Sequence, residues 1–191
     1  MKIIYYLMRD IMKPLVPGKY PEKFEKYVRI KDGTRIFIRP IKPEDSDLWV
    51  QFYLSLSRMA KYYRFFSSRS EPDKKMIKKY TQIDYINDMA LIAIVSENEK
   101  QRMIGVARYV IVKKTGGAEI AVVISDDWQG KGLGTKLLIN LLDIIIKRNI
   151  PKLCGDVFLE NDKMMKIIKD SGFKLISKND MNVKHFEIKL K

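Results

Sequence analysis

Residues Ala118 to Ile146 read AEIAVVISDDWQGKGLGTKLLINLLDIII, and this stretch decides the fold of the chain. The β-branched run from Ile120 to Ile124 predicts a strand. Apolar residues from Leu133 to Ile146 recur at three- and four-residue steps, which predicts a helix. Between strand and helix lies a loop with three alternate glycines. Free backbone N–H groups at a helix start, together with the helix dipole, make such a loop an anion site.

The spacing of the glycines separates the known kinds of phosphate loop. A Walker A loop places Ser or Thr after Gly-Lys, whereas Gly130-Lys131 is followed by Gly132. A dinucleotide fingerprint, G-x-G-x-x-G, lacks its last glycine from either starting point. The spacing that remains is Q-x-x-G-x-G, filled by Gln129, Gly132 and Gly134.

This spacing, between a strand and an apolar helix, resembles the pyrophosphate loop of the GNAT superfamily of acyl-CoA-dependent N-acetyltransferases. The alternative is a glycine-rich strand-to-helix turn without a ligand, although alternate glycines at a helix start are costly without a reason. The resemblance implies acetyl-CoA as co-substrate. Its pyrophosphate would rest on the loop N–H groups with Lys131 adding charge, and its pantetheine would run along the strand like an added strand. The binding residues expected are Val122, Val123, Ile124, Gln129, Gly130, Lys131, Gly132, Leu133, Gly134, Thr135 and Asn161.

Composition narrows the class of protein. The chain has 191 residues, 46% of them hydrophobic, and a formal net charge of +14, which indicates one globular domain with a basic surface. The lysines are spread along the chain, which favours a solvated surface over a nucleic-acid interface. Cys154 is the only cysteine and His185 the only histidine, which argues against disulfides, a His-dependent triad and a zinc site. Without an apolar run of about 18–20 residues or a signal peptide, we expect a cytoplasmic protein without a membrane span or a metal.

The rest of the chain predicts an α/β (α+β mixed-sheet) fold: a mixed, mostly antiparallel sheet flanked by helices, of the GNAT kind. Residues 1–26, which contain three prolines, form an expected N-terminal arm, and residues 27–191 the acetyltransferase domain. The expected elements begin with a hairpin of Val28–Ile30 and Thr34–Arg39, turned at Asp32-Gly33, and two helices, over 41–57 and from Ser70–Asp73 to Gln82. The expected strands that follow are Ala90–Val95, Met103–Val112 and, after the long helix, Leu153–Leu159. The chain then predicts a helix Asn161–Asp170 ended by Gly172, and a pair of strands, Phe173–Ser177 and Val183–Leu190, turned at Asn179-Asp180.

Two positions leave alternatives open. Gly105 interrupts an expected strand, which indicates a bulge or the close approach of another backbone. The aromatic segment from Tyr62 to Phe66 is either core packing beside a cleft or a surface that shapes the acceptor pocket.

Further segments extend the resemblance from about Tyr27 to the C-terminus. Asn161 resembles the superfamily asparagine beside the pantetheine arm, although a helix N-cap explains it equally. Many members carry a tyrosine acid four residues before Gly172-Phe173, and here that position is Ile168. The segments KDGTRIFIRPIKPEDSDLW and SLSRMAKYYRFFS are similar to the protein-lysine acetyltransferase branch, whose module is often fused to acyl-CoA-synthetase-like subunits.

Acetylation of a lysine requires a base. Forming the neutral, nucleophilic amine of a lysine at pH 7 costs about 4.6 kcal/mol of free energy, because the pKa of its ammonium group lies near 10.4. Glu119 is the candidate that takes this proton, directly or through water, and apolar neighbours would raise its pKa to a useful range. The resemblance also places the catalytic glutamate of the branch here. Asp126 and Asp127 are alternatives that look like turn residues, and a strand-end salt bridge is the non-catalytic explanation of Glu119.

The sequence therefore favours transfer of acetyl from acetyl-CoA to a lysine of a protein. The acceptor would be a protein with an exposed lysine, such as an acyl-CoA synthetase or a basic DNA-associated protein, and direct nucleic-acid binding is disfavoured. A small-molecule amine acetyltransferase and a non-catalytic acyl-CoA-binding sensor remain the alternatives.

Overall fold

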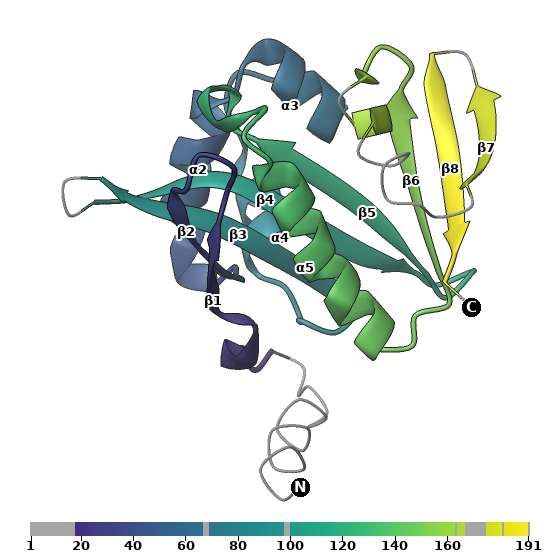
Figure 1. Cartoon of the computed structure of the whole chain (residues 1–191), viewed down its shortest axis with the longest axis horizontal. Helices are drawn as coiled ribbons and strands as arrows, with labels where there is room; N and C mark the ends of the chain where they lie inside the picture. The colour runs from purple at the N-terminus through teal and green to yellow at the C-terminus, as the bar shows by residue number, and fades with distance from the viewer. Residues whose placement is uncertain are drawn as a thin grey trace, which may run out of the picture.

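The computed structural model describes residues 18–66, 69–97, 100–162, 164–166, 175–180 and 182–190. Within them, eight strands form one sheet in the order β1-β2-β3-β4-β5-β6-β8-β7 (Figure 1). The strands are β1 (Lys26–Arg29), β2 (Arg35–Pro40), β3 (Asp88–Glu97), β4 (Lys100–Val112), β5 (Gly117–Ile124), β6 (Lys152–Phe158), β7 (Leu175–Asp180) and β8 (Val183–Lys189). The helices are η1 (Glu22–Phe24), η2 (Pro43–Asp45), α2 (Ser46–Ser55), α3 (Arg58–Phe65), α4 (Lys74–Thr81), η3 (Asp126–Trp128) and α5 (Leu133–Lys147).

The sheet is mixed and mostly antiparallel, as the sequence predicts. Its only parallel pair among the described strands is β5 with β6, which the long helix α5 connects. In Figure 1, α5 crosses one face of β3, β4 and β5, while α2, α3 and α4 lie on the other side. The predicted α/β architecture, a mixed and mostly antiparallel sheet flanked by helices, is therefore confirmed.

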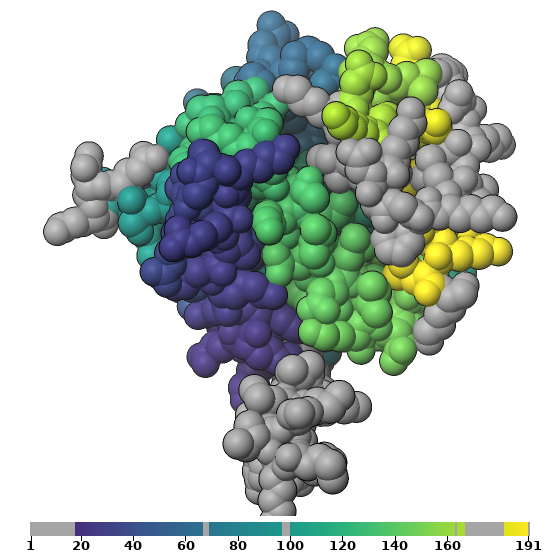
Figure 2. Space-filling view, in the orientation of Figure 1, coloured from purple at the N-terminus to yellow at the C-terminus, as the bar shows by residue number. Residues whose placement is uncertain are grey.

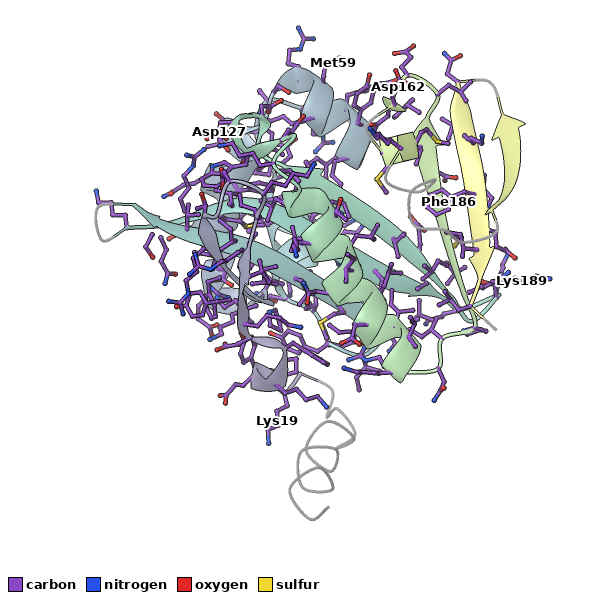
Figure 3. All side chains as sticks on the ribbon, viewed as in Figure 1. Lys19, Met59, Asp127, Asp162, Phe186 and Lys189 are labelled. Carbon is purple, nitrogen blue, oxygen red and sulfur yellow. The ribbon has the colours of Figure 1, made fainter. Side chains whose placement is uncertain are left out.

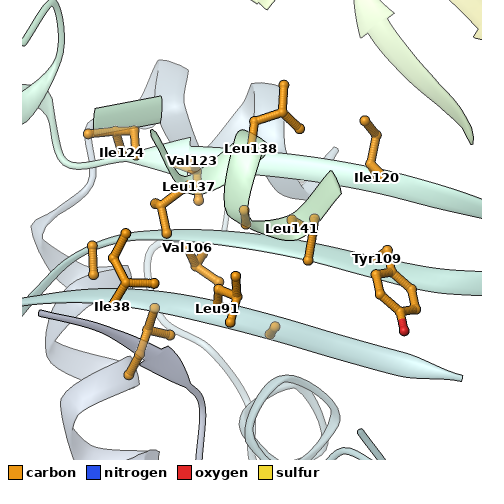
Figure 4. Packing of buried hydrophobic residues seen from close by; sticks show 14 of the residues in the cluster. Ile38, Leu91, Val106, Tyr109, Ile120, Val123, Ile124, Leu137, Leu138 and Leu141 are labelled. Carbon is orange, nitrogen blue, oxygen red and sulfur yellow. The ribbon is translucent and has the colours of Figure 1, made fainter. Parts of the chain in front are cut away.

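The core lies between α5 and the centre of the sheet. Leu137 and Leu141 of α5 are completely buried and lie over β4 and β5 near Ile124 and Tyr109 (Figure 4). Their three- and four-residue spacing on the helix puts them on one face, which is the face that the sequence pattern predicts. Burial of this stripe fixes the start of α5, and with it the glycine loop, against the end of β5.

Gly105 lies at a bulge, which is one of the two explanations that the sequence left open, and the two atoms closest to a Cβ there would belong to side chains and not to another backbone. The pairing of β3 with β4 shifts between Ala93 and Ile94, opposite Gly105, so a bulge is present. A Cβ on Gly105 would also lie 2.6 Å from Cδ1 of Ile124 and 3.2 Å from Cδ1 of Leu137. Glycine at this position lets β4, β5 and α5 approach one another.

Several boundaries differ from the prediction. The expected helix over 41–57 is η2 and α2, and it ends at Ser55. A separate helix, α3, then begins after Ser57, whose hydroxyl accepts from the N–H of Ala60 as an N-cap. The predicted turn at Asn179-Asp180 is wrong, because both residues pair within β7 and Asp180 lies opposite Val183.

Other predictions fall partly or wholly outside the described residues. The expected helix after Asn161 is seen at Asp162 and at residues 164–166, whereas Ile168, Gly172 and Phe173 are not described. Of the expected N-terminal arm, residues 18–26 are described. The N–H of Gly18 donates to the carbonyl of Asp84 (3.2 Å), and β1 begins at Lys26.

Candidate active site

A cavity of about 840 Å³ opens where β5 leaves β6. The two strands pair at Ala118 with Leu153 and at Glu119 with Cys154, and no further pair follows. The later residues of β5, Val122 to Ile124, line the cavity instead of pairing with β6. The β5 backbone is therefore available on one edge to an extended ligand, as the sequence predicts for a pantetheine arm.

The glycine loop closes one end of this cavity. Gly130 and Gly132 have φ values of 77° and 84°, a left-handed conformation that side chains rarely adopt. Gly132 is the N-cap of α5, so the first N–H groups of that helix are free to bind an anion. The loop and helix-start residues that line the cavity are Gln129, Gly130, Gly132, Leu133, Gly134 and Thr135.

Two side chains of the loop have structural partners. The amide of Gln129 donates to the carbonyl of Ile124 (3.1 Å) and so ties the loop to the end of β5. Lys131 does not line the cavity, and its ammonium lies 4.5 Å from the centre of the Trp128 ring. The expected contribution of Lys131 to phosphate binding remains a prediction.

Lys31 is a lining residue that the sequence did not reveal. It lies in the turn between β1 and β2, and its N–H donates to the carbonyl of Lys131 (3.2 Å). A Cβ on Gly132 would lie 3.2 Å from Cγ of Lys31, so the lysine stem covers that glycine. Figure 2 shows the purple N-terminal hairpin against the green start of α5. No sequence signal identifies this contact, because the hairpin and the loop are far apart in the chain.

Helix α3 forms the opposite wall. Its N-terminal end is fixed next to η3, which precedes the glycine loop, because the N–H and the hydroxyl of Ser57 donate hydrogen bonds to the Asp126 carboxylate (3.0 and 2.8 Å). Met59, Ala60, Tyr63 and Arg64 line the cavity. Figure 3 shows Met59 on α3 and Asp162, another lining residue, on the segment beyond β6.

The aromatic segment of α3 contributes to the core and to the wall of the cavity, which is the first of the two explanations that the sequence left open, and a role in shaping the acceptor pocket remains a prediction. Phe65 packs in the core against Trp49, Tyr53 and Tyr80 with ring centres 5.1–6.3 Å apart. Tyr63, in contrast, lines the cavity with its ring 5.7 Å from that of Phe158. Burial lowers the pKa of the neighbouring Arg64 guanidinium.

Glu119 is exposed, and it does not line the cavity. The expected apolar neighbours, Ala118 and Ile120, are buried, but the side chain of Glu119 itself is exposed, and its role as base remains a prediction. The two alternative carboxylates have other partners, since Asp126 accepts from Ser57 and Asp127 accepts from Arg102 (2.6 Å).

Asn161 also lines the cavity, and its side chain caps the following turn by accepting from the N–H of Met164 (3.1 Å). The capping explanation is thus observed, and the cofactor contact remains a prediction. Cys154 is buried, and this burial raises the pKa of its thiol, which disfavours the thiolate needed by a nucleophile. Among the described residues, no three His, Cys, Asp or Glu side chains gather as a metal site, and no helix could span a membrane.

A glycine anion loop, an open strand edge and a cavity between diverging parallel strands define the class of acyl-CoA-binding transferase folds. The chain belongs to the acetyltransferase (GNAT) domain family, whose model matches residues 35–174.

Relatives of several kinds agree with this assignment. The GNAT domain of S. lividans PAT superimposes with a TM-score of 0.82 and 28% identity, covering 90% of this chain and 100% of that domain. The acetyltransferase PA5475 of Pseudomonas aeruginosa is 35% identical over 60% of this chain, and the acetyltransferase Pat of Mycolicibacterium smegmatis is 25% identical over 76%. The matches cover only 62% and 43% of these two proteins.

Proposed function

We propose that this protein transfers an acetyl group from acetyl-CoA to the side-chain amine of a lysine in a protein. The observation that carries the proposal is that one cavity is lined both by the glycine loop and by the end of β5, where β6 has left it. A ligand with an anionic end and an amide-containing arm fits both parts of this cavity.

The described residues fit acetyl-CoA. Its pyrophosphate would accept hydrogen bonds from the N–H groups at the start of α5, where Gly130 and Gly132 leave the backbone uncovered. Its pantetheine amides would pair with the main chain of Val122–Ile124. The acyl end would then lie farther back along β5, towards Glu119, and a backbone N–H of this strand would polarise the thioester carbonyl.

Glu119 is the proposed general base for direct attack by the amine. Because its side chain is exposed beside the strand opening and outside the cavity lining, the proton would reach it through water. Removing the proton from a lysine ammonium at pH 7 accounts for about 4.6 kcal/mol of the barrier, so the loss of a base has a measurable effect.

The protein-lysine acceptor rests on two supports. The segments 31–49 and 55–67 resemble the protein-lysine acetyltransferase branch, and they supply Lys31 and the α3 wall of the cavity. The likeness to the S. lividans PAT domain extends over 90% of the chain. An acyl-CoA synthetase and a basic DNA-associated protein are the acceptors to test first.

The test compares Glu119→Gln with Asp156→Asn, a matched control. Asp156 is an exposed carboxylate on β6, two residues beyond the partner of Glu119, and it does not line the cavity. We expect Glu119→Gln to lower kcat by about 10²- to 10⁴-fold with unchanged CoA binding, and Asp156→Asn to retain activity. Full activity of Glu119→Gln would rule out this base. Heat protection by acetyl-CoA without any acetylated product would instead indicate a sensor.

A further inference from the structure

Arg64 of α3 is a cation in the cavity wall that the proposed reaction does not use. Its side chain is half-buried, and its Nε atom is buried without a hydrogen-bond acceptor among the described residues. No described carboxylate forms an ion pair with Arg64, whereas the neighbouring Arg108 is paired with Asp88. Burial also lowers the pKa of the Arg64 guanidinium, which indicates a poorly solvated charge. A cation in such a place is unfavourable until an anion pairs with it.

The ring of Tyr80 on α4 shows over which face of the sheet this guanidinium lies. The guanidinium carbons of Arg64 and Arg108 lie 5.5 and 4.8 Å from the centre of the Tyr80 ring. Arg108 stands on β4 directly opposite Ala121 of β5. Directly opposite residues of an antiparallel pair point to the same face of a sheet. Arg64 therefore lies over the face to which Arg108 and Ala121 point.

Glu119 points to the same face. Side chains alternate along a strand, so Glu119, Ala121 and Val123 of β5 share one face, and Val123 lines the cavity together with Arg64. Glu119 lies two residues before Ala121, about 7 Å along the strand. Its cross-strand neighbour Val110 is 40% exposed, so this part of the face is open to a substrate. The proposed base and the cavity cation thus lie on one face, which an acceptor can approach.

Two side chains of opposite charge on one face favour a substrate that carries the complementary pair. The amine of an acceptor would approach Glu119, its proposed base. A carboxylate on the same acceptor would meet Arg64, because a planar guanidinium binds a carboxylate through two parallel hydrogen bonds. A second cation at that position of the acceptor would be repelled by Arg64 and would leave its charge unpaired.

We propose that Arg64 binds a carboxylate that the acceptor carries close to its reactive amine. This inference rests on the proposed function and narrows its substrate class. In a protein the carboxylate belongs to an aspartate or glutamate beside the modified lysine, and in a small molecule it is the carboxylate of an amino acid. Arg64 orients the acceptor and takes no part in making or breaking bonds.

The test compares the full chain carrying Arg64→Met with Arg58→Met, a matched control. Arg58 lies on the same helix, is exposed and does not line the cavity. One pair of acceptors is a peptide with a lysine between two glutamates and the same peptide with two glutamines. The other pair is free lysine and lysine amide. We would measure kcat/KM with acetyl-CoA and with succinyl-CoA, acceptor binding to the CoA-saturated protein by calorimetry, and Tm without ligands.

We expect the wild type and Arg58→Met to favour the carboxylate member of a pair by about 10- to 100-fold, and Arg64→Met to lower this ratio to about 1. A ratio for the peptides assigns the carboxylate to a protein, and a ratio for free lysine assigns it to a small molecule. Arg64→Met should not lower Tm, because it removes a poorly solvated charge and keeps an apolar stem.

No preference in the wild type, or a preference that persists in Arg64→Met, would overturn the carboxylate site. A lower Tm of Arg64→Met with an unchanged ratio would show that Arg64 serves the fold alone. A preference for succinyl-CoA over acetyl-CoA that Arg64→Met abolishes would assign Arg64 to the acyl chain and overturn the proposal for the acceptor. A wild type that acetylates no amine would overturn the proposed function, whereas the calorimetric ratio would still decide the role of Arg64.

Discussion

Replacement of Lys31 by methionine tests whether the β1–β2 hairpin belongs to the phosphate site. The change removes one positive charge and keeps a stem of similar length over Gly132. A charge pair at about 4 Å contributes about 1 kcal/mol in water and about 4 kcal/mol at an effective dielectric constant of 20. Because Lys31 is exposed, the lower value applies, which corresponds to about fivefold weaker binding of CoA.

The assay is calorimetric titration with CoA at low salt and at about 0.5 M salt, where screening removes most of an exposed interaction. The difference between Lys31→Met and the wild type should shrink at high salt. Lys26→Met is the control, since Lys26 is exposed on the same hairpin but does not line the cavity. Wild-type affinity of Lys31→Met, or an equal loss in Lys26→Met, would refute a local contact with phosphate.

Two further predictions concern stability. Gly105→Ala should lower the free energy of unfolding by about 1–3 kcal/mol, because the added Cβ would lie 2.6 Å from Ile124 Cδ1. Ile124→Val removes that atom, so the double variant should regain part of the lost stability in thermal denaturation. Burial opposes ionisation of Asp84, but hydrogen bonds from the side chain and N–H groups of the next residues outweigh it and hold its pKa below 3.8. This stabilisation is present at pH values above the pKa that Asp84 has in the unfolded chain, and it is lost as the pH falls through the lower pKa that Asp84 has in the folded chain. Asp84→Asn should therefore be less stable at pH 7 and show a flatter loss of stability below about pH 4 in denaturant titrations.

The local parts of the fold could be predicted from the sequence. The glycine loop, β5 and α5 are consecutive in the chain, so periodicity and spacing alone indicate their arrangement. The β1–β2 hairpin follows in the same way from Asp32-Gly33, where Gly33 has a φ of 85° and Asp32 accepts from the N–H of Thr34.

Helix α3 could not be predicted, because its apolar residues do not form one stripe. Phe65 enters the core, whereas Tyr62 and Phe66 are exposed and stack on Phe158 of β6. Its N-cap is held by Asp126, which lies far away in the sequence. Contacts of this kind depend on the assembled fold and leave no local pattern.

The burial of Glu119 could not be predicted from the sequence for a related reason. The alternation of β5 predicts buried neighbours, and Ala118 and Ile120 are indeed buried. Burial of Glu119 itself would require an element over the opposite face. Among the described elements, α3 lies against β5 but leaves Glu119 exposed. Which helix covers which end of a strand is a tertiary property that a single strand does not encode.

The central claim is acetyl transfer to protein lysines with Glu119 as the base. The most direct measurement incubates isotope-labelled acetyl-CoA with wild-type protein or Glu119→Gln and with a lysate of the source cell, followed by mass spectrometry of modified lysines. We predict labelled lysines on specific proteins with the wild type and about a hundredfold fewer with Glu119→Gln. Label only on small amines, or equal labelling by both proteins, would contradict the claim.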